Sequence, residues 1–399
     1  MNNTTRILIF LAIVGAAFGA WAIYRGQGGA VPTVTVSTGD TALPQRAGGA
    51  QPGAAPPGTG TALVLVTSAT KKDWLKPEVD WYNATRGGNV SITYLESRDA
   101  LQGILNGKNT PNLWSPTATL WANRLSEAWA TKHGGEPLVS AADPKEYRVY
   151  LRTPLVFVTT KDKVAALRPL LSGAQAWENL ADLASGRKKL PGATRPFVWA
   201  HADPLKSNSG FLTLGLLLDA YARKAGVAAD SQAAGSPGFA AFLIDAEKTM
   251  PLNDSVRAGS TQLLADFVGN PGRYDVIATY ESSALGAAQT NPNVAVIYPM
   301  PTAVSEEAVV VLDGAWNTAA QKTEAAKLLA FLGEDESVRA GVTDRFRPAQ
   351  EAATISLAPQ LEQHQAQGFQ TAFTPADLPS YDALNDAAGT WNRIIGHRK

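Results

Sequence analysis

The residues best suited to chemistry lie in one strand-to-helix turn, Ser207-Asn208-Ser209-Gly210. Bulky apolar residues at Phe197–Trp199 predict a β-strand before this turn, and apolar residues at helical spacing over Phe211–Leu218 predict a helix after it. The first N–H groups of a helix have no partner within it, and the helix dipole gives them partial positive charge. Either a cap by Ser209 satisfies them, or a bound polar or anionic ligand does.

Three earlier turns repeat this order of strand, serine and helix. The strands are predicted at Ala62–Val66, Val90–Leu95 and Asn112–Trp114. The hydroxyl residues that follow them are Ser68, Ser97, Ser115 and Thr117. For Ser68 and Ser97, helix capping is the alternative to ligand binding. Because ligands of open α/β sheets lie at the carboxyl ends of the strands, we expect all these hydroxyls to face one site.

The later part of the chain continues the alternation. Further strands are predicted at Pro154–Thr160, Tyr274–Tyr280, Val294–Tyr298 and Ala308–Leu312. Repeated strand and helix segments predict an α/β fold with a mainly parallel sheet. Two long strands, Pro154–Thr160 and Tyr274–Tyr280, are expected to cross between two lobes, so that the cleft between the lobes closes around a ligand by hinge motion.

Composition excludes several classes of function. A chain of 399 residues predicts two domains, and equal numbers of acidic and basic residues, 35 of each, disfavour a nucleic-acid partner. The absence of cysteine excludes disulfides and thiolate chemistry. The four histidines are scattered without metal-ligand spacing, and no GxSxG nucleophile turn is present. We therefore expect no enzyme, no catalytic residue, no metal and no cofactor.

The N-terminal part is predicted to export the rest. Residues Ile7–Tyr24 carry no charge and would form a helix of about 27 Å, close to the thickness of the bilayer core. The alternative is a cleaved signal peptide with Ala17-Phe18-Gly19 near the cleavage site. The predicted organisation is an anchor or signal (1–25), a Gly/Pro/Ala-rich linker (26–60), lobe 1 (61–155), lobe 2 (156–279), and the remainder of lobe 1 with C-terminal helices (280–399).

Seven motifs in order resemble one family. They are VTSATKKDW (66–74), LESRDALQGILNGKNTPNLWSPTATLW (95–121), TPLVFVTTKDKV (153–164), HADPLKSNSGFLTL (201–214), YDVIATYESSAL (274–285), YPMPTAVSEEAVVVLDGAW (298–316) and RFRPA (345–349). Together the motifs resemble bacterial extracellular solute-binding proteins of the type II periplasmic-binding-protein fold, and are most similar to its membrane-tethered, substrate-binding-like branch.

The resemblance implies a bilobal α/β fold with two crossing strands and a ligand cleft. The residues at matching positions are Ser68, Ser97, Ser115, Thr117, Ser207, Asn208, Ser209, Tyr280 and Glu281. Glu281 departs from a purely anionic site, because a carboxylate repels a bound anion. Either the ligand carries a cationic or donor group, or Glu281 has a structural role with Arg98 or a backbone N–H as its partner. For Tyr280, a place in the core or hinge is the alternative to a ligand contact.

The function that the resemblance implies is capture of a small polar or anionic solute for an ABC-type transporter in the membrane. The expected location is extracytoplasmic, on a single-pass anchor, or secreted if the signal is cleaved. The alternative is a membrane-tethered adaptor or signalling module that uses the same fold to bind a protein or an extracellular polymer.

Overall fold

The structure is a computed structural model that describes residues 58, 60–349 and 363–398. Its strands are β1 (Leu63–Thr67), β2 (Val90–Tyr94), β3 (Leu113–Ser115), β4 (Tyr147–Thr160), β5 (Trp199–Ala200), β6 (Val276–Tyr280), β7 (Val294–Ile297), β8 (Val304–Val311) and β9 (Arg347–Pro348). Its α-helices are α2 (Lys72–Arg86), α3 (Ser97–Leu105), α4 (Thr119–Lys132), α5 (Lys161–Leu171), α6 (Ala176–Ser185), α7 (Asn208–Ala225), α8 (Ser231–Ala234), α9 (Pro237–Ala246), α10 (Asp254–Ala258), α11 (Ser260–Gly269), α12 (Glu281–Thr290), α13 (Ala319–Leu332), α14 (Asp335–Thr343) and α16 (Tyr381–Trp391). Shorter turns are η1 (Ala69–Lys71), η2 (Gln365–Gln367) and η3 (Asn392–Gly396).

The strands form a mixed sheet. Within the described residues the order is β2-β1-β3-β8-β4-β6-β5, with β7 and β9 each paired to β4. The pairs β1–β2, β1–β3 and β5–β6 are parallel, whereas β8 and β4 pair antiparallel to their neighbours. The α/β class is therefore confirmed, but the expectation of a mainly parallel sheet is wrong. Because β4 and β8 run against the strands beside them, five of the eight pairings among the described residues are antiparallel.

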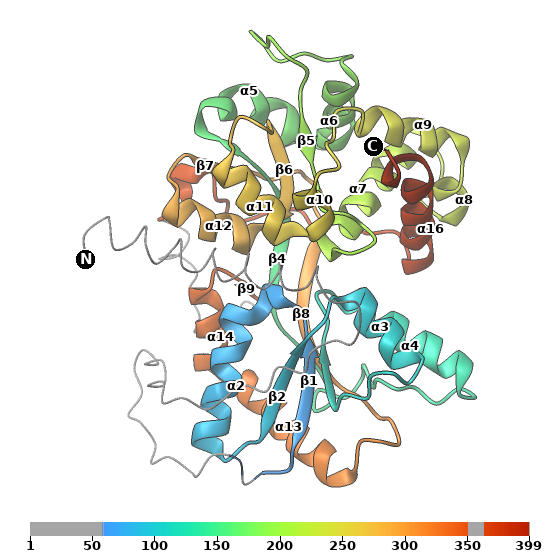
Figure 1. The fold of residues 1–399 in the computed structure, drawn as a ribbon, viewed down its shortest axis with the longest axis vertical. Helices are drawn as coiled ribbons and strands as arrows, with labels where there is room; N and C mark the ends of the chain where they lie inside the picture. The colour runs from blue at the N-terminus through green and yellow to red at the C-terminus, as the bar shows by residue number, and fades with distance from the viewer. Residues whose placement is uncertain (1–57, 59, 350–362, 399) are drawn as a thin grey trace, which may run out of the picture. The chain divides into compact units, whose positions relative to one another are not determined.

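The strands form two sets that share β4. The lower set in Figure 1 contains β1, β2, β3, β8 and β9, and the upper set contains β5, β6 and β7. Residues Tyr147–Pro154 of β4 pair with β8, and Leu155–Thr160 of the same strand pair with β6 and β7, so β4 belongs to both sets. Figure 1 shows β4 and β8 running between the upper and lower elements. The first crossing lies where it was predicted. The second does not, because β6 pairs only within the upper set and the chain returns between β7 and β8.

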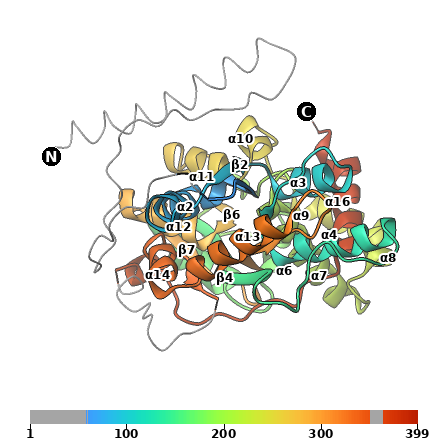
Figure 2. The ribbon, with the colours of Figure 1, turned by 90° about the horizontal axis from the view of Figure 1, so that it is seen from below.

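Helices cover both faces of the β2-β1-β3 sheet. On one face Leu63 and Leu65 pack with α2, α13 and the segment around Phe346, and on the other Val66 and Trp114 pack with α3 and α4. Figure 2 shows α2 and α14 apart from α3 and α4. Alternate side chains of one strand thus feed two cores, as the two-residue period of a strand requires. The carboxyl ends of these strands remain uncovered by either layer.

The predicted lobe limits need correction at their last segment. We expect residues 280–399 in lobe 1, but β7 pairs with the second half of β4, and α16 packs against α7. The start of α16 also reaches the first lobe: the Tyr381 ring lies 5.6 Å from that of Trp121, and Arg98 donates to Asn385 at 3.1 Å. Helix α16 therefore contacts elements of both lobes.

The predicted anchor, Ile7–Tyr24, and nearly all of the predicted linker lie outside the described residues. Within the described ranges, none of the helices has the length and apolar character needed to cross a membrane.

Candidate ligand-binding site

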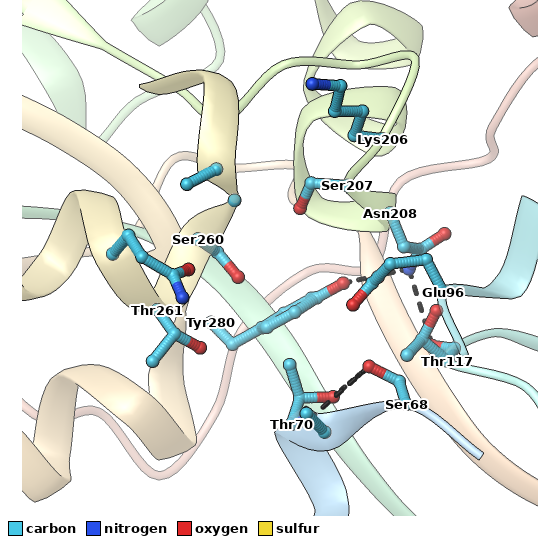
Figure 3. A pocket seen from close by; sticks show the side chains of 14 residues that line it. Ser68, Thr70, Glu96, Thr117, Lys206, Ser207, Asn208, Ser260, Thr261 and Tyr280 are labelled. Atoms are coloured by element: carbon cyan, nitrogen blue, oxygen red, sulfur yellow. Dashed lines mark hydrogen bonds between the residues drawn. The ribbon is translucent and has the colours of Figure 1, made fainter. Parts of the chain in front are cut away.

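A cavity of about 180 Å³ lies where the turns after β1, β2 and β3 face the starts of α7 and α11. Figure 3 shows side chains from both lobes directed into it. The first lobe contributes Ser68, Ala69, Thr70, Glu96 and Thr117. The second lobe contributes Lys206, Ser207, Asn208, Ala258, Gly259, Ser260, Thr261, Gln262 and Tyr280. Five of the predicted site residues thus line one cavity: Ser68, Thr117, Ser207, Asn208 and Tyr280.

The start of α7 is built differently from the sequence expectation. Ser207 is the N-cap residue, but its side chain makes no capping bond; instead its hydroxyl lies 3.0 Å from that of Ser209. Ser209 is fully buried inside the first turn and does not line the cavity. The expected cap by Ser209 is therefore wrong, because helix α7 begins at Asn208, two residues too early for it. A β-carbon at Gly210 would lie 2.0 Å from the Ala202 carbonyl oxygen, so the preceding loop packs directly on the helix.

Asn208 joins the two lobes. Its Oδ1 accepts from the Trp121 indole N–H at 2.6 Å, and its Nδ2 donates to the Tyr280 hydroxyl at 2.9 Å and to the Thr117 carbonyl at 3.4 Å. Its side-chain amide is almost wholly buried. Burial raises the pKa of the Tyr280 phenol, although the bond from Asn208 opposes that shift, so Tyr280 stays neutral at physiological pH.

The start of α11 was missed by sequence reasoning. Its N-cap is Gly259, whose φ of 127° is accessible to glycine and strained for other residues, and which offers no capping side chain. Ser260 follows it, 7% exposed, and its hydroxyl has no hydrogen-bond partner among the described residues. Figure 3 shows that hydroxyl on the cavity side. The signal was present as Gly259-Ser260-Thr261, directly before the apolar residues of α11.

The serines of the first lobe divide into one that faces the cavity and two that do not. Ser68 caps η1 by accepting from the Thr70 N–H at 3.4 Å, and it also lines the cavity, so capping and exposure to a ligand coexist. Ser97 bonds to the hydroxyl and the N–H of Thr117, at 2.9 and 3.0 Å. Ser115 donates to the Ala308 carbonyl at 2.6 Å. Ser97 and Ser115 fix the turns without reaching the cavity.

A buried ion pair lies next to these turns and was also missed. The Lys71 ammonium is fully buried, 2.9 Å from the Glu307 carboxylate, and it donates to Ser115 Oγ and to the carbonyls of Ser115 and Pro116. Burial lowers the pKa of Lys71 and raises that of Glu307, and their mutual attraction opposes both shifts. The pair ties η1 to strand β8, which fixes the turn that carries Ser68.

Glu281 points away from the cavity. Arg347 in β9 donates to it from Nε at 2.9 Å and from Nη2 at 2.7 Å, with both side chains at most 4% exposed. The expected partner Arg98 instead lies over the rings of Trp121 and Phe211, at 5.5 and 5.0 Å. The geometry supports the structural alternative for Glu281, with Arg347 in place of Arg98. The motif RFRPA carried the signal, since it supplies this arginine.

Two charged side chains line the cavity, one from each lobe. Glu96 is the N-cap residue of α3 and Lys206 precedes α7; both are exposed. Among the described residues neither side chain forms an ion pair. Partial burial and the nearby Asp99 raise the pKa of Glu96, and a hydrogen bond from Ser68 opposes this. The described residues contain no group of three acidic or histidine side chains able to hold a metal ion.

Comparison with known families shows to which family this chain belongs. Residues 63–340 match a family profile described as bacterial extracellular solute-binding protein. The chain belongs to that family. A comparison with curated protein sequences gave no match. The family resemblance expected from the seven motifs is thereby confirmed.

Three solved structures of binding proteins have the same fold as this chain. The sulfate-binding protein SubI from Mycobacterium tuberculosis H37Rv has a TM-score of 0.53 at 18% identity, covering 85% of this chain and 99% of SubI. Iron-bound HitA from Pseudomonas aeruginosa has 0.54 at 13% identity, covering 84% and 99%. AfuA from Actinobacillus pleuropneumoniae, with fructose-6-phosphate bound, has 0.51 at 14% identity, covering 84% and 96%. At these identities the likeness shows the bilobal binding-protein fold.

Proposed function

We propose that this solute-binding protein captures a small anionic solute in the cavity between its lobes. The observation that carries the proposal is the convergence of two helix starts, those of α7 and α11, on one cavity. Neither N-cap residue caps its helix with a side chain, so the first N–H groups of both helices lack that common partner. A bound oxyanion or carboxylate satisfies such groups and is stabilised by the positive ends of both dipoles.

The lining adds donors of the right kind. The hydroxyl of Ser260, a residue only 7% exposed, has no partner among the described residues, and Ser207, Thr70 and Thr117 present further hydroxyls. Lys206 supplies one positive charge at the mouth. A cavity of about 180 Å³ has room for a small solute. The solved relatives named for sulfate and for fructose-6-phosphate are consistent with an anionic solute.

The proposal includes delivery to an ABC-type transporter from an extracytoplasmic position. It rests on family membership and on the uncharged segment Ile7–Tyr24 followed by the polar linker. Added protease should digest the globular part in intact spheroplasts. Full protection of that part would contradict the location.

The test of the binding proposal has two parts. Native mass spectrometry of the purified protein asks whether a small anion copurifies, and calorimetric titration with sulfate, phosphate and short carboxylates measures affinity. We expect at least one anion to bind, and Ser207→Ala to weaken it by about fivefold, the loss of about one hydrogen bond. Absence of any bound anion in both experiments would overturn the proposal and favour the adaptor alternative.

A further inference from the structure

The cavity contains a carboxylate that a purely anionic ligand would have to avoid. Sequence reasoning raised this question for Glu281, which the structure pairs with Arg347 outside the cavity. The carboxylate that does line the cavity is Glu96, at the opposite wall from the start of α11. Glu96, and not Glu281, is therefore the acidic group that would lie beside a bound anion.

Glu96 has no ion-pair partner among the described residues. Within the part of the chain that the structure describes, it forms no ion pair, and as N-cap of α3 its side chain makes no capping bond. Asp99, in the first turn of the same helix, is also acidic. When ionised, a carboxylate offers only acceptor atoms. It attracts a hydrogen-bond donor and repels another acceptor oxygen.

The cavity is thus polarised between its walls. The starts of α7 and α11, with Ser260 and Lys206, present donors and positive charge on the second-lobe side. Glu96 presents acceptors on the first-lobe side. An occupant complementary to both walls is negative at one end and carries an N–H or O–H at the other.

We propose that the solute is an anion that itself carries a hydrogen-bond donor, and that Glu96 accepts from that donor and excludes oxyanions that have none. This rests on the proposed function, since it concerns the same cavity. Donor-bearing anions include hydrogen phosphate, through its O–H, and aminoalkylphosphonates, through an ammonium group. Sulfate has the same tetrahedral shape but no proton at neutral pH. Selectivity of this kind arises because a ligand without a donor leaves the Glu96 carboxylate without a hydrogen bond from the ligand.

The test uses the purified full-length protein and three probes: sulfate, inorganic phosphate and aminomethylphosphonate. Calorimetric titration at neutral pH should show at least one donor-bearing probe binding more tightly than sulfate by about tenfold or more, since one lost or repelled hydrogen bond at a charged group has that effect. The tighter of the two donor probes identifies the donor as O–H or N–H.

The decisive variant is Glu96→Gln, which keeps the size of the side chain and adds an amide that can donate. It should weaken the donor-bearing probe and strengthen sulfate, reducing the ratio of affinities by about tenfold. Asp99→Asn is the matched control, because it removes a negative charge from the same first turn without touching the cavity, and the ratio should then stay unchanged.

Two results would overturn the inference while leaving the proposed function standing. One is sulfate binding to the unaltered protein as tightly as both donor probes. The other is a ratio of affinities that Glu96→Gln and Asp99→Asn change to the same extent. If the unaltered protein bound none of the probes and no other anion copurified, the proposed function would fail as well. Thermal unfolding without ligand confirms that both variants are folded.

Discussion

The starts of α7 and α11 face the same cavity, yet the protein uses them in different ways. At α7, Asn208 bonds to Trp121, Tyr280 and Thr117, and its side chain belongs to a network that joins the lobes. At α11, Gly259 has no side chain and the Ser260 hydroxyl has no partner among the described residues. The Asn208 side chain at the start of α7 is therefore held by the fold, whereas the Ser260 side chain at the start of α11 is available to a ligand.

The difference separates polar residues that build a site from those that respond to its occupant. A buried side chain whose hydrogen bonds are complete loses little or nothing when a ligand is absent. A hydroxyl that faces the cavity without a partner in the protein bonds to water or to the ligand, so its bond contributes to affinity and not to the ligand-free fold. Stability without ligand should therefore depend on the first group, and affinity on the second.

The largest effect is expected for Asn208→Ala. This variant leaves the buried Trp121 N–H without its acceptor and removes the donor to Tyr280, and each unsatisfied buried group costs about 1–3 kcal/mol. Chemical denaturation of the ligand-free protein should show a loss of about 2–4 kcal/mol. A loss as small as that of Ser260→Ala would show that the network does not stabilise the structure.

Ser260→Ala should weaken ligand binding and leave the stability of the ligand-free protein almost unchanged. The free energy of unfolding without ligand should change by less than about 0.5 kcal/mol, because no bond inside the described protein is removed. Affinity for the anion found to bind should fall by about fivefold, the effect of one hydrogen bond. Titration calorimetry and denaturation on the same preparation check both values. Unaltered affinity would contradict the idea that α11 contacts the solute.

The smallest effect is expected for Ser209→Ala. A capping serine would cost about 1 kcal/mol, but Ser209 lies inside the helix and its Oγ partner is the hydroxyl of Ser207. Ser207 can redirect its hydroxyl to water in the cavity, so we expect a loss below about 0.5 kcal/mol and nearly normal affinity. Thermal unfolding distinguishes this from a cap, and a loss near 1 kcal/mol would restore the capping interpretation.

Much of the fold could be predicted because the spacing of apolar residues differs between strands and helices. β1, β2, β3 and α7 begin within three residues of their predicted positions. The second crossing could not be placed, because a continuous apolar run such as Tyr274–Tyr280 fits any buried strand and pairing depends on partners far along the chain.

The site was predictable only in outline. The rule that parallel strands end at one edge predicts Ser68, Thr117 and Ser207 at one site, and all three line the same cavity. It could not exclude Ser97 and Ser115, whose partners, Thr117 and the Ala308 carbonyl, are defined by tertiary contacts. Gly259 and Ser260 follow a helix instead of a strand, so the rule gave no reason to notice them.

Helix α16 should affect how often the two lobes are open in the ligand-free protein. It packs on α7 of the second lobe, while Tyr381, Asp382 and Asn385 contact Trp121, Arg124 and Arg98 of the first. Opening the lobes must break these contacts, which together contribute about 1–2 kcal/mol. Tyr381→Ala should therefore raise the radius of gyration of the ligand-free protein in X-ray scattering, and an unchanged value would contradict this. Since apparent affinity scales with the fraction of molecules ready to bind, the C-terminal helix would tune capture of the solute without touching it.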